Sequence, residues 1–444
     1  ATDQGKTGGL VGAAVLAKAR GLAIEAVGLP TMRPYTSPVS WGAFAGREVG
    51  RHFHAVRRTP LDDWNRRNGA VFMDAGLWAR AAYFPKAGEG AWDAILREAR
   101  TVRQAVGICD VSTLGKIDVQ GRDAATFLDR IYTNTFSTLP VGRARYGLML
   151  REDGIVFDDG TTSRLAPDHF LVTTTTAKAA EVLEHMEHYA QVVWPELDVQ
   201  ICTVTDQWGQ MSIAGPRSRD VLAACVEGAA LDNASLPFMG VVEARIAGVA
   251  VTLFRISFSG ELAYEVAAPA GATEAVWSAI LTAGAPHGIA PYGVEALAVL
   301  RVEKGHVAGA EINGQTTAGD LGLARMLKKN GDFVGRVNAG RPGLVAADRP
   351  RLVGIQSLDT DFARRLRAGA QIVESSGSKA SLGWVTSVTR SVELDRWIGL
   401  AMVRGGPERI GETLHAIYPL KGEAPPVKLV SPHHVDPENA RVRA

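Results

Sequence analysis

Two adjacent aspartates at the end of a strand-like segment are the first residues whose spacing suggests chemistry. Residues 145–159 read RYGLMLREDGIVFDD, in which two apolar runs flank a turn and the second run ends at Asp158 and Asp159. Because successive side chains of a strand point to opposite faces, only one of these carboxylates can face a given pocket. That arrangement suits a single carboxylate held against a reacting amine. Acidic pairs at strand ends are also often solvated, so the pattern alone leaves both interpretations open.

Two further segments carry charged residues at informative positions. Residues 255–265 read RISFSGELAYE, and strand alternation would put Ala263 and Glu265 on one face. A buried glutamate there needs a strong partner, because an unpaired buried charge is costly. Residues 301–305 read RVEKG at the end of a predicted helix. Basic residues near a helix C-terminus also stabilise the helix itself, so a structural role for Arg301 stays open.

Other kinds of catalytic site have no support in the sequence. The chain contains no GxSxG, HExxH or strand-preceded GxGxxG segment, and its histidines do not cluster at metal-ligand spacing. Cys109, Cys202 and Cys225 are far apart and form no CxxC pair. The sequence therefore predicts no metal site and no disulfide framework, and it favours a reducing, cytoplasmic location.

Composition describes an ordinary globular protein. The chain has 444 residues, 46% hydrophobic and 21% charged, with 48 basic and 47 acidic side chains and a net charge of +1. That balance gives no field that would attract nucleic acid or an anionic membrane, and the apolar runs are too short for a membrane helix. The length allows two or three domains with substantial cores.

Periodicity divides the chain into three regions. Residues 1–60 combine an Ala-rich helix at Val11–Ala23 with a Pro-punctuated stretch at Leu29–Pro38, and they predict an extended connector arm. Residues 61–345 mix strands and helices without strict alternation, which indicates an α+β architecture. Among the elements predicted there are the strand Trp208–Ala214, two strands about Gly248, and the helices Ala177–Tyr189 and Val294–Lys304. Residues 346–444 contain short strand-like segments separated by Gly, Pro, Ser and Asp, which is typical of a small antiparallel barrel or sandwich.

Six stretches in this order resemble the folate-dependent aminomethyltransferases, the family of the glycine-cleavage T-protein. No single stretch is decisive, but together they span most of the chain. The matching stretches are residues 107–134, 145–159, 213–219, 255–265, 292–305 and 382–403.

The arm RPYTSPVSWGAFAGRE, residues 33–48, has no counterpart in free-standing T-proteins. It resembles the connector in the alpha subunits of heterotetrameric sarcosine oxidases, which joins an upstream dinucleotide-binding region to a C-terminal folate region. By this resemblance the chain is the C-terminal part of such a subunit or a separately encoded equivalent. The start at Ala1 without Met fits that expectation.

The resemblance implies roles for individual residues. Asp159 matches the catalytic aspartate that lies close to the reactive folate nitrogen, and Tyr146 matches the tyrosine upstream of it. Glu265 matches the glutamate that binds the pterin, since a carboxylate can accept two parallel N–H donors of the aminopyrimidinone edge. Arg301 lies on the helix that carries family binding residues. An ion pair of Arg301 with Glu295 or Glu303 is the structural alternative.

Two positions depart from the family pattern. Phe258 replaces the tyrosine of the T-protein GYTGE motif, and Thr174 replaces an asparagine that ends a strand. These changes suggest weaker or differently shaped folate binding. They also keep open a non-enzymatic alternative, in which the fold is a platform that shields a flavin at a subunit interface.

The resemblance finally implies a fold and a reaction. The fold expected is a three-lobed α+β ring around a folate channel, with the C-terminal β-barrel as one lobe. The reaction expected begins on a flavin-bearing beta subunit (FMN or FAD, on or shared with that partner), which oxidises an N-methyl amine such as sarcosine. Tetrahydrofolate on this chain receives the methylene, and 5,10-methylenetetrahydrofolate and glycine result. Small subunits complete the implied complex, with neither nucleic acid nor membrane as partner. The alternative enzyme is a free-standing aminomethyltransferase of glycine-cleavage type.

Overall fold

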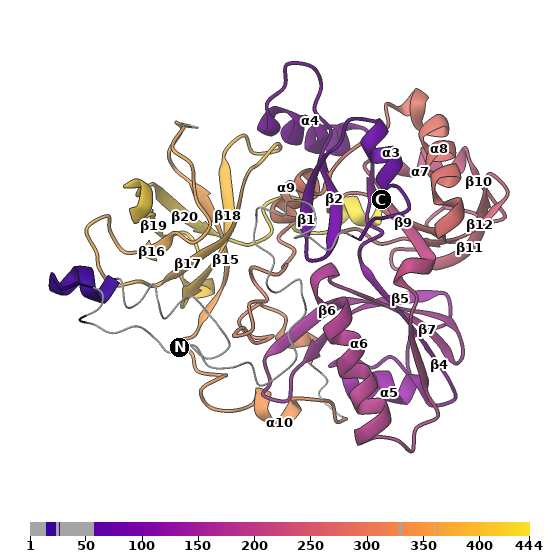
Figure 1. Cartoon of the computed structure of the whole chain (residues 1–444), viewed down its shortest axis with the longest axis horizontal. Coiled ribbons are helices and arrows are strands. Elements are labelled where there is room, and N and C mark those ends of the chain that lie inside the picture. Colours follow the sequence, from indigo (N-terminus) through magenta and orange to yellow (C-terminus); the bar gives the residue numbers. More distant parts are fainter. Residues whose placement is uncertain (1–14, 24–25, 27–56, 328–330, 362) are drawn as a thin grey trace. The chain divides into compact units, whose positions relative to one another are not determined.

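The computed structural model describes residues 15–23, 26, 57–327, 331–361 and 363–444 (Figure 1). The chain divides into two compact units, residues 1–56 and 57–444. In the first unit residues 15–20 are helical, within the predicted Ala-rich helix, whereas the predicted extended segment Leu29–Pro38 lies outside the described residues. Within the described ranges no helix is long and apolar enough to cross a membrane. The predicted domain boundaries at residues 60 and 345 stay predictions.

The second unit begins with a helix and a β-hairpin that pack near a long amphipathic helix. The elements are α3 (Asp62–Arg67), β1 (Val71–Ala75), β2 (Trp78–Tyr83) and α4 (Ala91–Gln104). The buried positions of α4, Ala94 to Val102 among them, recur at helical spacing because one stripe of the helix faces the core. This stripe contacts α9 (Val294–Lys304), a helix whose bounds match the sequence prediction.

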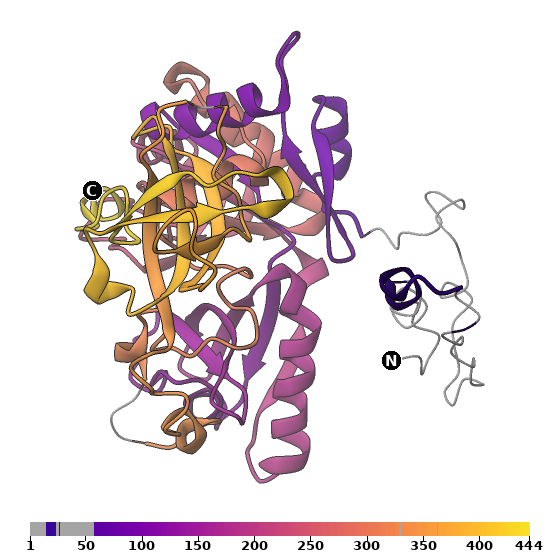
Figure 2. The same cartoon turned by 90° about the vertical axis from the view of Figure 1, so that its left-hand side faces the viewer.

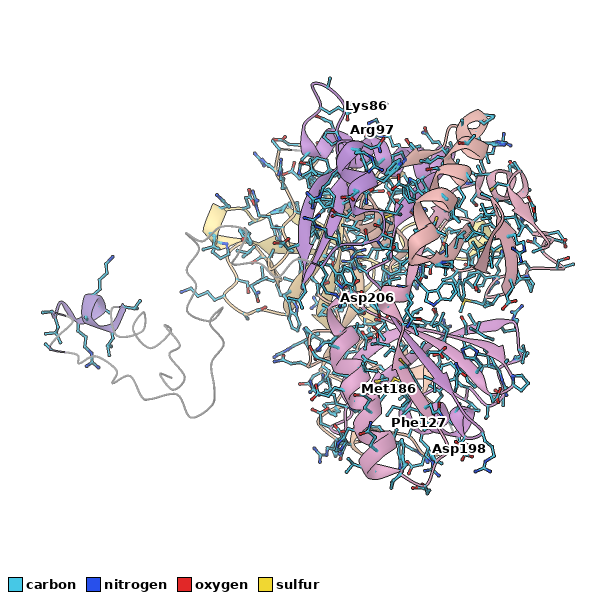
Figure 3. The ribbon with its side chains drawn as sticks, turned by 45° about the vertical axis from the view of Figure 1, so that its right-hand side comes forward. Lys86, Arg97, Phe127, Met186, Asp198 and Asp206 are labelled. Carbon is cyan, nitrogen blue, oxygen red and sulfur yellow. The ribbon has the colours of Figure 1, made fainter. Side chains whose placement is uncertain are left out.

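A five-stranded antiparallel sheet forms the next layer, in the order β5-β6-β7-β4-β8. Its strands are β5 (Arg143–Leu150), β6 (Val156–Ala166), β7 (His169–Thr174), β4 (Gly115–Gln120) and β8 (Gln200–Thr203). Helices α5 (Ala124–Ile131) and α6 (Ala179–His188) cover one face, where Phe127 and Met186 are fully buried (Figure 3). Burying each such side chain contributes about 1.5–3 kcal/mol. The other face, which α5 and α6 leave uncovered, carries polar side chains beside apolar ones such as Leu148 and Leu171.

A seven-stranded sheet contains the second acidic segment, in the order β10-β11-β12-β13-β9-β3-β14. Its strands are β10 (Val226–Glu227), β11 (Val241–Ile246), β12 (Val249–Phe254), β13 (Ala263–Pro269), β9 (Trp208–Ala214), β3 (Gly107–Asp110) and β14 (Ala290–Pro291). Helices α7 (Ser218–Ala223) and α8 (Thr273–Gly284) pack on one face around Trp277. The predicted strand Trp208–Ala214 and the strand pair about Gly248 are confirmed.

The C-terminal region is a closed six-stranded barrel, as the short strand-like segments predicted (Figure 2). The strands run β15-β18-β17-β16-β19-β20 around it. They are β15 (Pro350–Ser357), β18 (Trp397–Arg404), β17 (Gly383–Arg390), β16 (Gln371–Val373), β19 (Thr413–Ile417) and β20 (Pro426–Val430). Two short helices, α10 (Arg336–Ala339) and α11 (Ala440–Arg443), flank the barrel in sequence. The α+β body and all-β tail predicted from the sequence are therefore confirmed.

The two sheets meet along the faces that lie opposite helices α5 and α6 in one sheet and α7 and α8 in the other. An apolar cluster joins Leu171 of β7 to Phe254 and Ala267 of the seven-stranded sheet. An isolated bridge pairs Arg143 with Gly240 at the same junction. By strand alternation, Asp159 and Glu265 lie on these two faces.

Candidate functional site

Tyr146 and Asp159 form a hydrogen-bonded pair on the five-stranded sheet. In the β5–β6 register Tyr146 lies opposite Thr161 and Leu148 lies opposite Asp159. The Tyr146 hydroxyl donates to Asp159 Oδ2 over 2.8 Å, and both side chains are half-buried. Strand alternation puts Tyr146, Asp159 and Thr161 on the face that helices leave uncovered.

A β-bulge decides which aspartate faces which way. Leu150 pairs with Val156 but Met149 pairs with Asp158, so Phe157 is the extra residue of β6. After the bulge Asp158 points to the helix-covered face, where it is 4% exposed and accepts a hydrogen bond from the Thr175 backbone N–H over 3.2 Å. The two carboxylates therefore point to opposite faces, and Asp159 is the one on the uncovered face.

The surroundings of Asp159 make it a stronger base than an ordinary carboxylate. Burial raises the pKa of its carboxyl to about 6, the hydrogen bond from Tyr146 opposes that rise, and the charge of Glu311 adds to it. Glu311 is fully buried. Two hydrogen bonds connect its backbone to strand β6: Thr316 Oγ1 donates to the Glu311 carbonyl, and Val156 N–H donates to the Thr316 carbonyl. A carboxylate with this pKa can accept a proton near neutral pH and release it again.

Glu265 lies in strand β13 of the seven-stranded sheet, on the face that meets the five-stranded sheet. It lies opposite Phe254 on one side and Ser212 on the other, and it is half-buried. Gln210 Nε2 donates to Glu265 Oε2, whereas Oε1 accepts no hydrogen bond from the described residues. Burial raises the pKa of Glu265 to about 7, and the Gln210 hydrogen bond and the charge of Lys116 oppose that rise.

Strand neighbours of the five-stranded sheet lead from the Asp159 face to Lys116, whose charge acts on Glu265. Thr161, on the Asp159 face, hydrogen-bonds Thr173 through their hydroxyls over 2.8 Å. Thr173 pairs with Lys116 in the β4–β7 register, and the Lys116 charge acts on Glu265. Asp159 and Glu265 thus lie on the sheet faces that meet at this junction, and Lys116 of the five-stranded sheet is the residue whose charge acts on Glu265.

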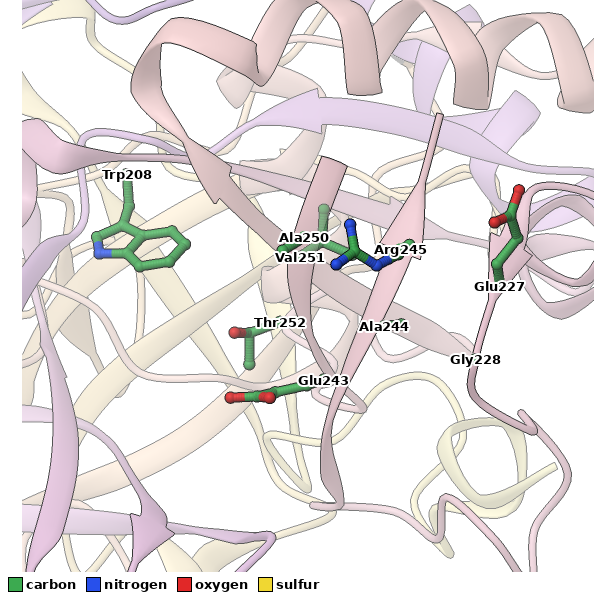
Figure 4. A pocket seen from close by; sticks show the side chains of 9 residues that line it. All are labelled: Trp208, Glu227, Gly228, Glu243, Ala244, Arg245, Ala250, Val251 and Thr252. Carbon is green, nitrogen blue, oxygen red and sulfur yellow. The ribbon is translucent and has the colours of Figure 1, made fainter. Parts of the chain in front are cut away.

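Two surface hollows accompany this junction, and neither is lined by Asp159 or Glu265. The first lies between the facing sheets beside Glu265, since Phe254 and Ala267 line it together with Leu171 of β7. The second lies over the edge strands of the seven-stranded sheet and combines Trp208 with charged side chains of β10 and β11 (Figure 4). Trp208 and Thr252 line both hollows.

Thr174 does not join Asp159. It ends β7 on the helix-covered side, 2% exposed, and its hydroxyl donates to the Thr175 carbonyl over 3.2 Å. A Cβ at Gly115 would come within 2.1 Å of Thr174 Oγ1, so this glycine permits the close approach of β4 and β7. The side chain that β7 contributes to the Asp159 face is Thr173.

Phe258 and Arg301 lie near the chain segment that follows α9. Phe258 is 38% exposed and stacks on His306, with 5.4 Å between ring centroids and 11° between planes. Arg301 donates to Glu311 Oε2 over 3.0 Å and to Ser387 Oγ of the barrel over 2.7 Å. Arg301 therefore forms a structural ion pair, as the alternative interpretation expected, but its partner is Glu311 rather than Glu295 or Glu303.

Three residues of this site had no role in the sequence analysis. Gln210 lies in strand β9, which was predicted correctly. It is two residues from Ser212, the residue opposite Glu265, so its side chain is on the same face as that of Glu265. The pairing of β9 with β13 would therefore have indicated it. Lys116 lies in a stretch that matches the family, but its burial depends on a turn. Glu311 comes from a segment without regular structure, and no local pattern indicated it.

Comparison with known proteins gives consistent matches over the second unit. The model of the GCVT N-terminal domain matches residues 61–331, and that of the glycine cleavage T-protein C-terminal barrel domain matches residues 351–436. Sarcosine oxidase subunit alpha of Rhizobium meliloti is 49% identical over 100% of this chain and 45% of its own length. This chain spans about half the length of the sarcosine oxidase subunits that it matches.

Shorter relatives match from end to end. The aminomethyltransferase of Saccharopolyspora erythraea is 30% identical over 84% of this chain and 97% of its own length. The crystal structure of the glycine cleavage system aminomethyltransferase T from Bartonella henselae superposes with a TM-score of 0.74 at 23% identity. It covers 86% of this chain and 98% of that one, and it establishes the same fold.

Proposed function

This chain belongs to the glycine cleavage T-protein family of aminomethyltransferases and is homologous to sarcosine oxidase alpha subunits, and we propose that it is the folate-binding part of a sarcosine oxidase-type complex. In that complex a flavin-bearing partner subunit oxidises a secondary N-methyl amine such as sarcosine. This chain then transfers the resulting methylene to tetrahydrofolate.

The reaction balances without a further reagent. The oxidised amine carries its methylene as an iminium, and two folate nitrogens, each losing one proton, become bridged by that carbon. The amine leaves with both protons, so that 5,10-methylenetetrahydrofolate and glycine result from sarcosine. Without folate, water takes up the methylene as formaldehyde.

The residues present fit a reduced pterin. Glu265 offers a free Oε1 and a second lone pair on Oε2, which matches two parallel N–H donors of an aminopyrimidinone edge. Gln210 fixes the orientation of that carboxylate through its own hydrogen bond. Asp159 takes one proton from a folate N–H and returns it to the leaving amine, and Tyr146 holds Asp159 in place meanwhile. A positioned acid–base group of this kind contributes about a hundred- to ten-thousandfold in rate.

The observation that carries this proposal is the pair of half-buried carboxylates, Asp159 and Glu265, on facing sheet surfaces at one junction. Burial raises the pKa of both, which is characteristic of working acids and bases. The 49% identity with a sarcosine oxidase alpha subunit over the whole chain supports the choice of methylene donor.

The test has two parts. The full chain is first titrated with tetrahydrofolate under reducing, anaerobic conditions while tryptophan fluorescence is followed. Saturable binding is expected. The chain is then combined with its flavin-bearing partner, and methylenetetrahydrofolate and formaldehyde are measured during amine oxidation. Formaldehyde as the sole product at saturating folate would contradict the proposal, and absence of folate binding would favour the flavin-shielding platform instead.

The second candidate is an aminomethyltransferase of glycine-cleavage type, which the end-to-end match to the Saccharopolyspora erythraea enzyme favours. It predicts folate-dependent release of ammonia from an aminomethyl group bound to a lipoyl carrier. The same preparation assayed with that carrier and no flavin subunit discriminates between the two enzymes.

A further inference from the structure

Lys116 is a buried lysine that forms no ion pair with the described residues. It lies in β4, its residue is fully buried, and Nζ donates to the backbone carbonyls of Ser112 and Leu114 over 2.9 Å each. The other deeply buried lysine, Lys304, instead donates to a carboxylate oxygen of Asp436 over 2.9 Å. A buried ammonium without a direct counter-ion is costly, so its presence requires a separate explanation.

The turn whose carbonyls accept hydrogen bonds from Lys116 also contacts Gln210, the hydrogen-bond partner of Glu265. Ser112 Oγ accepts a hydrogen bond from the Gln210 backbone N–H over 2.9 Å and donates to the Gln210 carbonyl over 3.3 Å. The Gln210 side chain then donates to Glu265. Three links therefore connect the ammonium to the pterin-binding carboxylate through one turn and one strand.

Three acids lie within electrostatic reach of the ammonium: Asp110, Asp206 and Glu265. Asp110 already accepts hydrogen bonds from Thr59 and Asn65 and from the Ser112 backbone. Asp110 is also reached by the charge of Arg80.

Asp206 is exposed and pairs with Arg57, and it lies at the junction of the two sheets in Figure 3. Glu265 forms no ion pair with the described residues, and its charge also acts on the Tyr292 hydroxyl. Asp110 acts most strongly on the ammonium and Glu265 second, and the Lys116 charge in turn opposes the rise in the pKa of Glu265.

We propose that Lys116 is a positioning residue that holds Glu265 in its ionised form, with both oxygens available to accept the two N–H donors of a pterin. The inference rests on the proposed function, because it assigns to Lys116 the recognition of the same folate. An ionised carboxylate selects ligands that present paired donors, whereas a protonated one would lose that selectivity.

The direction of the coupling follows from the surroundings. Burial lowers the pKa of Lys116 to about 8, and the nearby acids oppose that decrease. Burial raises the pKa of Glu265 to about 7, and the Lys116 charge opposes that rise. Removing the ammonium therefore raises the pKa of Glu265 further, and folate binding then weakens at a higher pH than in the wild type.

The experiment measures the dissociation constant of tetrahydrofolate between about pH 6 and about pH 9 for the wild-type chain, K116M, K116R and the surface control K178M. In K116M the pH midpoint of binding is expected to rise by about 0.5–1 unit. Affinity then falls about two- to fivefold at the wild-type midpoint and about three- to tenfold well below it. K116R restores the midpoint because it keeps the charge, and K178M leaves it unchanged because Lys178 pairs with Glu181 at the surface.

An unshifted midpoint in a folded K116M that binds folate overturns the inference and leaves the proposed function intact. A wild-type chain that binds no folate at any pH overturns both. If K116M does not fold, linkage supplies the reciprocal test, since E265Q must lower the pKa of Lys116 by the same coupling. Carbon NMR of the lysine side chains follows that titration, and an unchanged Lys116 curve in E265Q overturns the inference.

Discussion

Asp159 and Glu265 are two half-buried carboxylates at one junction, but their neighbours differ in charge. Asp159 has a neutral hydrogen-bond donor, Tyr146, and feels the negative charge of Glu311. Glu265 has a neutral donor, Gln210, and feels the positive charge of Lys116. Burial raises the pKa of both acids, and the nearby charge then opposes the rise at Glu265 and reinforces it at Asp159.

This difference separates two uses of the same chemical group. A carboxylate that must exchange a proton benefits from a pKa near the working pH, and a negative neighbour keeps it there. A carboxylate that must accept two hydrogen bonds benefits from staying ionised, and a buried cation favours that state. The comparison therefore predicts that changes near Asp159 affect the rate of transfer and changes near Glu265 affect the affinity for folate.

The largest effect is expected for D159N. The amide cannot take up a proton, so folate-dependent methylene transfer should fall by about a hundred- to ten-thousandfold while the folate dissociation constant and amine oxidation on the partner stay unchanged. Rapid-quench measurement of methylenetetrahydrofolate separates transfer from binding. D158N is the matched control, because its side chain points to the helix-covered face. An equal loss in D158N would remove the distinction between the two faces.

A loss of affinity is expected for E265Q. Hydrogen bonds to a charged group contribute about 1.5–3 kcal/mol, which corresponds to roughly ten- to a hundredfold in the folate dissociation constant. The rate of transfer at saturating folate should change little, because Glu265 contacts no reacting atom in the proposal. Q210L, which removes only the orienting hydrogen bond, should weaken binding less. A variant E265Q with normal affinity and slow transfer would reverse the assigned roles.

A smaller effect is expected for Y146F. The Tyr146 hydroxyl stabilises the ionised form of Asp159, so its removal raises the pKa of Asp159 above the wild-type value of about 6. Transfer depends on the ionised form, and it should therefore be lost at a higher pH as the solution is acidified. At higher pH, above the acid limb of the pH–rate profile, the rate of transfer should fall by about three- to tenfold, since one hydrogen bond is removed. The pH–rate profile at saturating folate measures both quantities.

Local sequence patterns predicted much of the fold because helices and strands follow from periodicity over a few residues. The bounds of α9 and β9 match the prediction, and the barrel followed from short alternating segments. Strand β20 was missed, since Pro425 and Pro426 precede its apolar residues and prolines favour a loop interpretation. The α6 helix begins later than predicted because residues 176–178 form a separate turn of 3₁₀-helix.

The site was less accessible from the sequence because its geometry depends on pairing between distant segments. Alternation indicated that one aspartate of the pair would face the site, but the bulge at Phe157 that sets their faces exists only in the register with β5. The family resemblance indicated Thr174, and the structure puts its neighbour Thr173 on the Asp159 face instead. The clasp of Arg301, Glu311 and Ser387 joins a helix, a loop and the barrel, which no local pattern could associate.

The smallest effect, and the sharpest test of the comparison, is expected for E311Q. Glu311 is fully buried against Arg301, and its charge raises the pKa of Asp159. Removing that charge lowers the pKa of Asp159, so that transfer should persist to lower pH, by less than about one unit. This shift is opposite in sign to that of Y146F.

S387A is the matched control, because Ser387 hydrogen-bonds both Glu311 and Arg301 but carries no charge. Breaking the buried pair costs about 3–5 kcal/mol of stability, and the profiles must therefore be recorded well below the unfolding temperature of each variant. If E311Q and S387A moved the acid limb equally, the clasp would act by positioning Asp159 rather than by charge. The electrostatic contrast between the two carboxylates would then rest on Lys116 alone.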